Sequence, residues 1–250
     1  MHDPQTRRCI GALHLDDVTN DELVARLVQA ATSPSEPVLC VALHVTALNE
    51  AMSNSAFRRM INEADFLYAD GVSVQILARR RGLRRSQRIA TTDLLPKLLV
   101  GVRVVIGRPV RLAIVGGAAG VATRAAENLA EEYDVDVVYV EHGFHEVENP
   151  VVAALAVTAP EVVLVGMGMP RELEWLTCHR RDLPPAVYVT CGGLLRLLAG
   201  IESRAPRIVQ RLRLEWAYRW VRSPRTVGHR YSVGLRSLFR AIVSPLECEL

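Results

Sequence analysis

The chain has 250 residues, half of them hydrophobic, and carries a formal net charge of +3. This length can bury the core of one large domain. No apolar run reaches the roughly 18 residues of a membrane-spanning helix, and the first residues lack the apolar segment of a secretory signal, so we expect a cytoplasmic protein.

The first predicted helix lies within the segment 16–31 and begins with a capping box. Thr19 is a candidate N-cap, and Glu22 stands three residues later, where its side chain can reach back to the N-cap backbone. Residues 37–45 follow as a short, continuous apolar segment, which is typical of a strand buried on both faces.

Strands then alternate with helices as far as residue 200. Several of the strands run into glycine turns that open a helix. Buried strands that alternate with helices predict an α/β fold, Rossmann-like, with a mostly parallel sheet and helices on both faces. The predicted segments are helix 47–62, strand 65–71, strand, turn and helix over 111–133, strand 135–143, helix 150–157, strand and turn 161–170, helix 171–181, and strand, turn and helix over 186–200.

The character of the chain changes after residue 202. Residues 203–240 carry ten Arg against one Glu and show no strand pattern, but apolar residues recur there at helical spacing. We therefore predict an α/β core at 1–202 and a C-terminal Arg/Trp-rich helical appendage at 203–250.

A second Arg cluster lies at 79–88, with six Arg. Two separate clusters favour an anionic partner such as phosphate or lipid headgroups. The chain holds few aromatic residues, and none form a stacking platform among the basic residues, which argues against nucleic acid. The five cysteines contain no CxxC pair and no evenly spaced framework, so we expect buried or incidental thiols and no metal site.

Ligands of an open parallel sheet bind beyond the carboxyl ends of its strands. A glycine turn that opens a helix there can hold a diphosphate on backbone amides. The spacing around Asp70 leaves two interpretations open, a turn or helix-capping residue and a general base at a strand tip. The candidates at strand ends are Asp70 with Gly71, Gly116 with Gly117, Gly166 with Gly168, and Gly192.

The order of motifs along residues 11–240 resembles that of the WecB/TagA/CpsF glycosyltransferases (glycosyltransferase family 26). The most specific pieces are the ADG turn at 69–71, GxGxPxxxxW at 166–175 and RAP–EWxxR at 204–219. The resemblance implies an inverting transfer of an N-acetylhexosamine or related sugar, without metal or cofactor, in cell-wall or exopolysaccharide synthesis. It implies a UDP-sugar donor, a polyprenyl-diphosphate-linked acceptor and a peripheral position on the inner face of the cell membrane. A homo-oligomer is compatible with it.

The resemblance also implies roles for individual residues. Asp70 matches the family's proposed base, which favours the second interpretation of this residue. Arg88 and Asp93 match an RxxGxD element, in which Thr91 replaces the usual glycine. The expected nucleotide-side residues are Gly116, Gly117, Gly166 and Gly168, with Gly71, Glu172 and Gly192 also expected to bind substrate. The appendage arginines that would close over the site and face the membrane are Arg204, Arg219, Arg225 and Arg230.

The chain departs from the family pattern at four positions. Ala42 and His44 stand where a TxN motif is usual, Glu172 replaces a glutamine, and Arg196 replaces an acidic residue. Either the donor sugar differs from N-acetylmannosamine, or catalysis is weakened and the chain binds a nucleotide or polyprenyl ligand. Because Asp70 and the arginines are retained, we favour a working enzyme with altered sugar choice. His44 could act as acid or base near neutral pH, and a structural histidine fits equally well.

Overall fold

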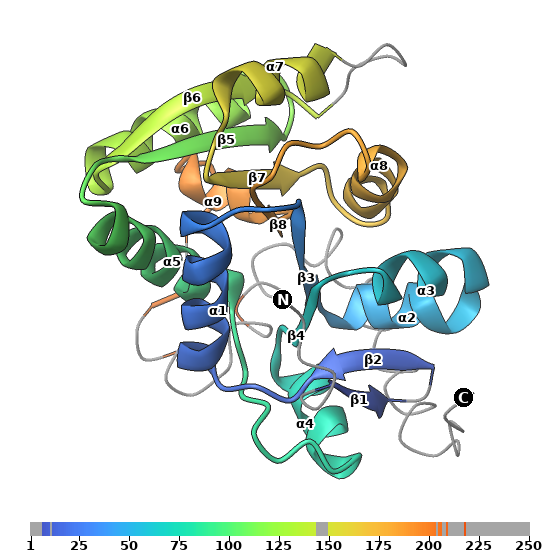
Figure 1. The fold of residues 1–250 in the computed structure, drawn as a ribbon. Coiled ribbons are helices and arrows are strands. Elements are labelled where there is room, and N and C mark those ends of the chain that lie inside the picture. Colours follow the sequence, from blue (N-terminus) through green and yellow to red (C-terminus); the bar gives the residue numbers. More distant parts are fainter. Residues whose placement is uncertain are drawn as a thin grey trace.

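The computed structural model describes residues 7–10, 12–143, 150–203, 205, 206, 209 and 218. They form an α/β fold with a two-stranded antiparallel sheet and a six-stranded sheet (Figure 1). The small sheet consists of β1 (Arg7–Ile10) and β2 (Leu13–Asp16). Most of the segment 203–250 lies outside the described residues, so the helical appendage stays a prediction.

The six-stranded sheet is parallel throughout and has the order β4-β3-β8-β7-β5-β6. All of its strands except the edge strand β6 are mostly buried, which explains their continuous apolar sequences. The strands are β3 (Val38–Leu43), β4 (Phe66–Ala69), β5 (Val110–Gly116), β6 (Val135–Glu141), β7 (Val162–Gly166) and β8 (Val187–Thr190).

Helices cover both faces of this sheet, as the sequence predicts. Helices α1, α5, α6 and α9 pack on one face and share a core with it, whereas α2, α3, α4, α7 and α8 pack on the other. The helices are α1 (Asn20–Thr32), α2 (Val45–Ser53), α3 (Ser55–Asn62), α4 (Val72–Arg80), α5 (Thr91–Ile106), α6 (Val121–Glu132), α7 (Pro150–Thr158), α8 (Arg171–His179) and α9 (Leu194–Leu198).

The expected capping box is confirmed at the start of α1. The backbone N–H of Glu22 donates to Thr19 Oγ1 at 3.3 Å, and the N–H of Thr19 donates to Glu22 Oε2 at 3.0 Å. The single helix predicted at 47–62 is wrong, because the structure has two helices there. Asn54 separates them: its Oδ1 accepts from the N–H groups of Ala56 and Phe57 and so starts α3.

No helix in the described part of the chain is long and apolar enough to cross a membrane. Cys40, Cys178 and Cys191 are free thiols, whereas Cys9 is disulfide-bonded. The expectation of buried or incidental thiols is therefore wrong for Cys9.

The connections of β5 and β7 create a switch point in the sheet. The chain leaves β5 toward the edge strand β6, and it leaves the neighbouring strand β7 in the opposite direction, toward β8. Such reversals open a crevice at the carboxyl ends of the strands, where α/β proteins bind ligands. Gly116 and Gly166 are register partners at this point.

Candidate active site

Asp70 lies directly after β4, at the carboxyl edge of the sheet. Its backbone N–H donates to the carbonyl of Leu43 at 3.0 Å, which ties it to the end of β3. The N-cap of α4 is the next residue, Gly71, whose φ of 91° suits glycine. Asp70 is half-buried, and its Oδ2 accepts a hydrogen bond from Thr91 Oγ1 at 3.4 Å. The N-cap position of α4 therefore belongs to Gly71 and not to Asp70.

A buried tyrosine contacts the same hydroxyl of Thr91 from the core. Tyr68 Oη lies 2.7 Å from Thr91 Oγ1, and the tyrosine is fully buried. Burial raises the pKa of Tyr68 well above its usual value, and the nearby thiol of Cys40 and carboxylate of Asp70 act in the same direction. The hydroxyl thus stays protonated. The sequence marked Thr91 only as a departure from a motif, and nothing in it connected Tyr68 to the site.

His44 lies at the neighbouring strand end, after β3. Its Nδ1 accepts a hydrogen bond from the N–H of Ala47 at 3.1 Å, which makes it the N-cap of α2. Leu43 and Ala69 are register partners, so His44 and Asp70 follow paired residues. The structure gives His44 a structural role; its role in proton transfer stays a prediction.

Glu172 joins the turns that follow β7 and β8. Its side chain comes from α8, is 2 % exposed, and accepts at Oε2 from the N–H groups of Gly168 at 3.0 Å and Gly192 at 3.1 Å. Burial raises the pKa of Glu172 to about 7, against the opposing effect of the N–H groups of Gly168, Gly192 and Met167. The carboxylate thereby uses two glycine amides that the sequence offered as ligands for substrate.

The glycine turns after β5, β6 and β7 are connected by backbone hydrogen bonds. The N–H of Gly117 donates to the carbonyl of Gly166, and the N–H of Gly143 donates to the carbonyl of Gly117, both at 2.9 Å. A Cβ on Gly116 would lie 2.4 Å from the carbonyl carbon of Gly166, so only glycine fits there. These turns therefore bring β5, β6 and β7 into close contact, and the Gly117 amide serves this packing.

Among the helices whose N-cap residues the structure describes, four of eight or more residues begin at this edge without a side-chain cap from the N-cap residue. They are α4, α5, α6 and α8, with N-caps Gly71, Ala90, Gly120 and Pro170. Uncapped N-terminal N–H groups and the helix dipole favour a bound anion. The arrangement can thus stabilise negative charge at the carboxyl edge of the sheet.

The other predicted residues are more scattered. Arg88 is half-buried just before α5, and Asp93 is exposed in the first turn of that helix. Arg196 Nε pairs with Glu202 Oε1 at 2.6 Å on the surface of α9. Within the residues that the structure describes, no group of three or more His, Cys, Asp or Glu could hold a metal ion. The appendage residues Arg204, Arg219, Arg225 and Arg230 lie outside the described residues.

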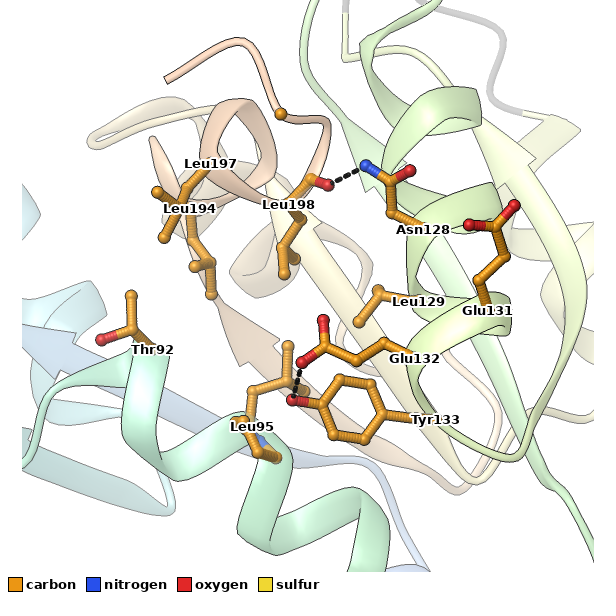
Figure 2. A pocket seen from close by; sticks show the side chains of 12 residues that line it. Thr92, Leu95, Asn128, Leu129, Glu131, Glu132, Tyr133, Leu194, Leu197 and Leu198 are labelled. Atoms are coloured by element: carbon orange, nitrogen blue, oxygen red, sulfur yellow. Dashed lines mark hydrogen bonds between the residues drawn. The ribbon is translucent and has the colours of Figure 1, made fainter. Parts of the chain in front are cut away.

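A cavity of about 670 Å³ lies between α5, α6 and α9 (Figure 2). Its apolar wall includes Leu95, Leu129 and Leu194. Asn128 Nδ2 donates across it to the carbonyl of Leu198 at 2.6 Å. The cavity reaches Thr92, the neighbour of Thr91, but its lining does not include Asp70. This cavity could not be predicted from local sequence patterns, because helices from distant parts of the chain form it.

The model of the glycosyl transferase WecG/TagA/CpsF family matches residues 8–247 of the chain. Two similar proteins are from Staphylococcus aureus, strains MW2 and NCTC 8325 / PS 47, and each is named N-acetylglucosaminyldiphosphoundecaprenol N-acetyl-beta-D-mannosaminyltransferase. Each is 26 % identical to this chain over 204 residues, which cover 81 % of this chain and 79 % of the relative.

Proposed function

Because the chain belongs to the glycosyl transferase WecG/TagA/CpsF family, we propose that this glycosyltransferase moves a sugar from a UDP-sugar to a polyprenyl-diphosphate-linked acceptor. The observation that carries the proposal is the placement of Asp70. The residue is half-buried at the carboxyl edge of the parallel sheet, and the N-cap of the next helix is a different residue. A carboxylate in this position can serve as a general base.

In the proposed reaction, Asp70 takes the proton of an acceptor hydroxyl. The oxygen attacks the anomeric carbon of the donor from the face opposite UDP, so a new C–O bond forms while the bond to the UDP oxygen breaks. This geometry inverts the configuration at that carbon. The diphosphate leaves with its negative charge, which arginine side chains and helix N-termini can stabilise without a metal ion.

The switch point between β5 and β7 is the proposed place of the nucleotide. The uncapped N-terminus of α6, at Gly120, comes four residues after the end of β5, and that of α8, at Pro170, comes four residues after the end of β7. The α6 end, which has no acidic residue in its first turn, suits a diphosphate better than the α8 end, whose first turn carries Glu172 and Glu174. The amides of Gly117, Gly168 and Gly192 already have partners in the protein, so we assign the diphosphate to helix ends rather than to those amides.

The donor sugar is proposed as an N-acetylhexosamine or a related sugar. The names of the relatives describe transfer of N-acetylmannosamine to an N-acetylglucosaminyl-diphosphoundecaprenol. In this chain, however, Ala42 and His44 stand at the end of β3, and Glu172 brings a carboxyl group between two of the turns. These differences favour a changed sugar preference.

We propose that the protein reaches its lipid-linked acceptor by binding to the anionic inner face of the cell membrane. Ile76 on α4 is 44 % exposed, and Arg79 and Arg80, three and four residues on, are exposed on the same side of the helix. An apolar side chain flanked by arginines suits an interfacial position on anionic lipid. Truncation after about residue 200 should weaken liposome binding in a salt-sensitive way if the appendage arginines share this role.

A second candidate function is ligand binding without catalysis. The observation in its favour is that His44 and Glu172, two departures from the family motifs, both use their side chains to hold helix ends or turns. A chain of this kind would bind UDP but would not turn over sugar.

The test measures UDP release from a panel of UDP-sugars with a polyprenyl-diphosphate-sugar analogue as acceptor. We expect release by the wild type and a loss of about 100-fold or more in Asp70→Asn, with UDP affinity unchanged by calorimetry. Asp136→Asn removes an exposed acid at the start of β6 and serves as the matched control, which should keep full turnover. Full turnover by Asp70→Asn would refute the base, and UDP binding without any turnover by the wild type would favour the second candidate.

A further inference from the structure

We propose that Thr91 is a positioning residue for Asp70 and that Tyr68 holds Thr91 in the required orientation. The inference rests on the proposed function, in which Asp70 takes the proton of the acceptor. Its basis is the pair of contacts made by one oxygen, since Thr91 Oγ1 lies 2.7 Å from Tyr68 Oη and 3.4 Å from Asp70 Oδ2. The three side chains come from β4, from the turn after it, and from the first residue of α5.

The chemistry of the groups fixes the direction of both hydrogen bonds. An ionised carboxylate can only accept, so the single hydroxyl proton of Thr91 must go to Asp70. Thr91 Oγ1 then has to accept from Tyr68, whose hydroxyl stays protonated because burial raises its pKa. The result is a directed chain from Tyr68 through Thr91 to Asp70, and it ends on the proposed base.

Burial makes this arrangement specific. Tyr68 is 0 % exposed and Thr91 is 7 % exposed, so bulk water cannot easily replace either partner. The N-cap of α5 is Ala90, which makes no side-chain cap bond. The Thr91 hydroxyl instead contacts Tyr68 in β4 and Asp70 directly after it. An aliphatic residue at position 91 would remove the acceptor of the Tyr68 hydroxyl and the donor to Asp70 at once.

The expected consequence is restraint of the carboxylate. A catalytic base must be held close to its productive geometry, and neighbouring hydrogen bonds usually supply that restraint. Asp70 lies in a turn, between the end of a strand and a glycine with a φ of 91°. We therefore expect side-chain hydrogen bonds, such as the one from Thr91, to orient its carboxylate. The family motif has a glycine where this chain has Thr91, and the hydroxyl is thus a feature by which this chain would orient its own base.

The test compares Thr91→Val, which keeps the branched shape without the hydroxyl, with Thr91→Ser, which keeps the hydroxyl. In the UDP-release assay we expect Thr91→Val to lower kcat about 10-fold with KM for donor and acceptor unchanged, because ground-state binding does not need the oriented base. Thr91→Ser should stay within about 2-fold of the wild type. Tyr68→Phe, which removes only the hydroxyl that orients Thr91, should give an intermediate kcat.

Thr91→Val made in the Asp70→Asn background separates a positioning role of Thr91 from a general structural effect of the substitution. If Thr91 acts through the carboxylate, Thr91→Val should leave the residual rate of Asp70→Asn unchanged. Three results would overturn the inference while Asp70 remains the base. They are an equal fold-loss of kcat from Thr91→Val in both backgrounds, a wild-type kcat in Thr91→Val, and a low kcat in a folded Thr91→Ser variant. Full turnover by Asp70→Asn, or none by the wild type, would instead overturn the proposed function and this inference with it.

Discussion

The carboxylate of Glu172 accepts a hydrogen bond from the backbone N–H of Gly192 at 3.1 Å, so a side chain of α8 holds the turn after β8. The same oxygen accepts from Gly168 at 3.0 Å in the turn after β7. One buried acid therefore sets the relative position of two turns at the candidate site, and its protonation has consequences for stability.

Glu172→Gln should stabilise the protein at alkaline pH. Burial raises the pKa of Glu172 from 4.5 to about 7, so the folded state binds its proton more tightly than the unfolded state. The wild type therefore loses stability as pH rises from about 4.5 to 7. The shift in pKa corresponds to roughly 3 kcal/mol of lost stability. We expect Glu172→Gln to recover only about 1 kcal/mol of it at pH 8, because the side-chain NH₂ of glutamine cannot accept the hydrogen bond that the backbone N–H of Met167 donates to the carboxylate. Urea unfolding of both proteins at pH 5 and pH 8 checks this.

Glu172→Ala is the contrasting variant. It leaves the N–H groups of Gly168 and Gly192 without their acceptor, so it should destabilise the protein by about 2 kcal/mol or more at pH 5. The difference should be smaller at pH 8, where the wild type has itself lost stability through ionisation of Glu172. Equal pH dependence of the wild type and Glu172→Gln would show that the carboxyl group does not titrate in this range.

His44→Ala should destabilise the protein, and His44→Asn should not. Alanine loses the cap that His44 Nδ1 provides to the N–H of Ala47, at a cost of about 1 kcal/mol, whereas asparagine is itself a favoured N-cap. Guanidinium unfolding at pH 8 measures both. Reduced turnover in a stable His44→Asn variant would support a part for the imidazole in proton transfer, and unchanged turnover would leave it the structural role alone.

Gly116→Ala should disrupt the centre of the sheet. Its Cβ would lie 2.4 Å from a backbone carbon of Gly166, and neither backbone can move away without breaking strand pairing. Gly107→Ala is the matched control, since Gly107 also has a positive φ but nothing within 4 Å of the added Cβ. The free energy of unfolding should fall by about 1 kcal/mol in the control, because of backbone strain. It should fall by several times as much in Gly116→Ala, or that variant should fail to fold. Thermal unfolding that gives equal losses would contradict the close approach.

Gly120→Asp should weaken UDP binding without unfolding the protein. A Cβ at this position meets nothing within 4 Å, and aspartate and asparagine both tolerate its φ of 80° better than other residues do. The added carboxylate would repel a diphosphate at the N-terminus of α6, and we expect a Kd for UDP about 10-fold higher. Gly120→Asn, with the same shape and no charge, should bind nearly as the wild type does in calorimetry. Equal affinities would place the diphosphate elsewhere.

Local sequence patterns were sufficient for much of the fold. Apolar β-branched runs and the glycines after them located β3, β4, β5, β7 and β8, because a strand buried on both faces leaves a continuous signal. The hairpin at 7–16 was missed, since its strands of four residues mix charged and apolar side chains. The break at Asn54 was also missed, because it depends on one side chain that caps the second helix.

The candidate site was less predictable than the fold. The pattern placed Asp70 at a strand end, but the contact with Thr91 joins residues 21 positions apart, and only the packing of α5 brings them together. The glycine turns were located correctly, yet the sequence could not show that Glu172 occupies two of their amides. Such contacts depend on which strands become neighbours, and local periodicity does not determine that.

The pairing of β3 with β8 has a consequence for the newly made protein. Leu39 and Tyr188 are register partners, although almost 150 positions separate them in the chain. During translation the ribosome must therefore release β8 before β3 and β4 can join the other strands. Until then, the first two strands of the sheet expose an edge that a chaperone or a second nascent chain could bind.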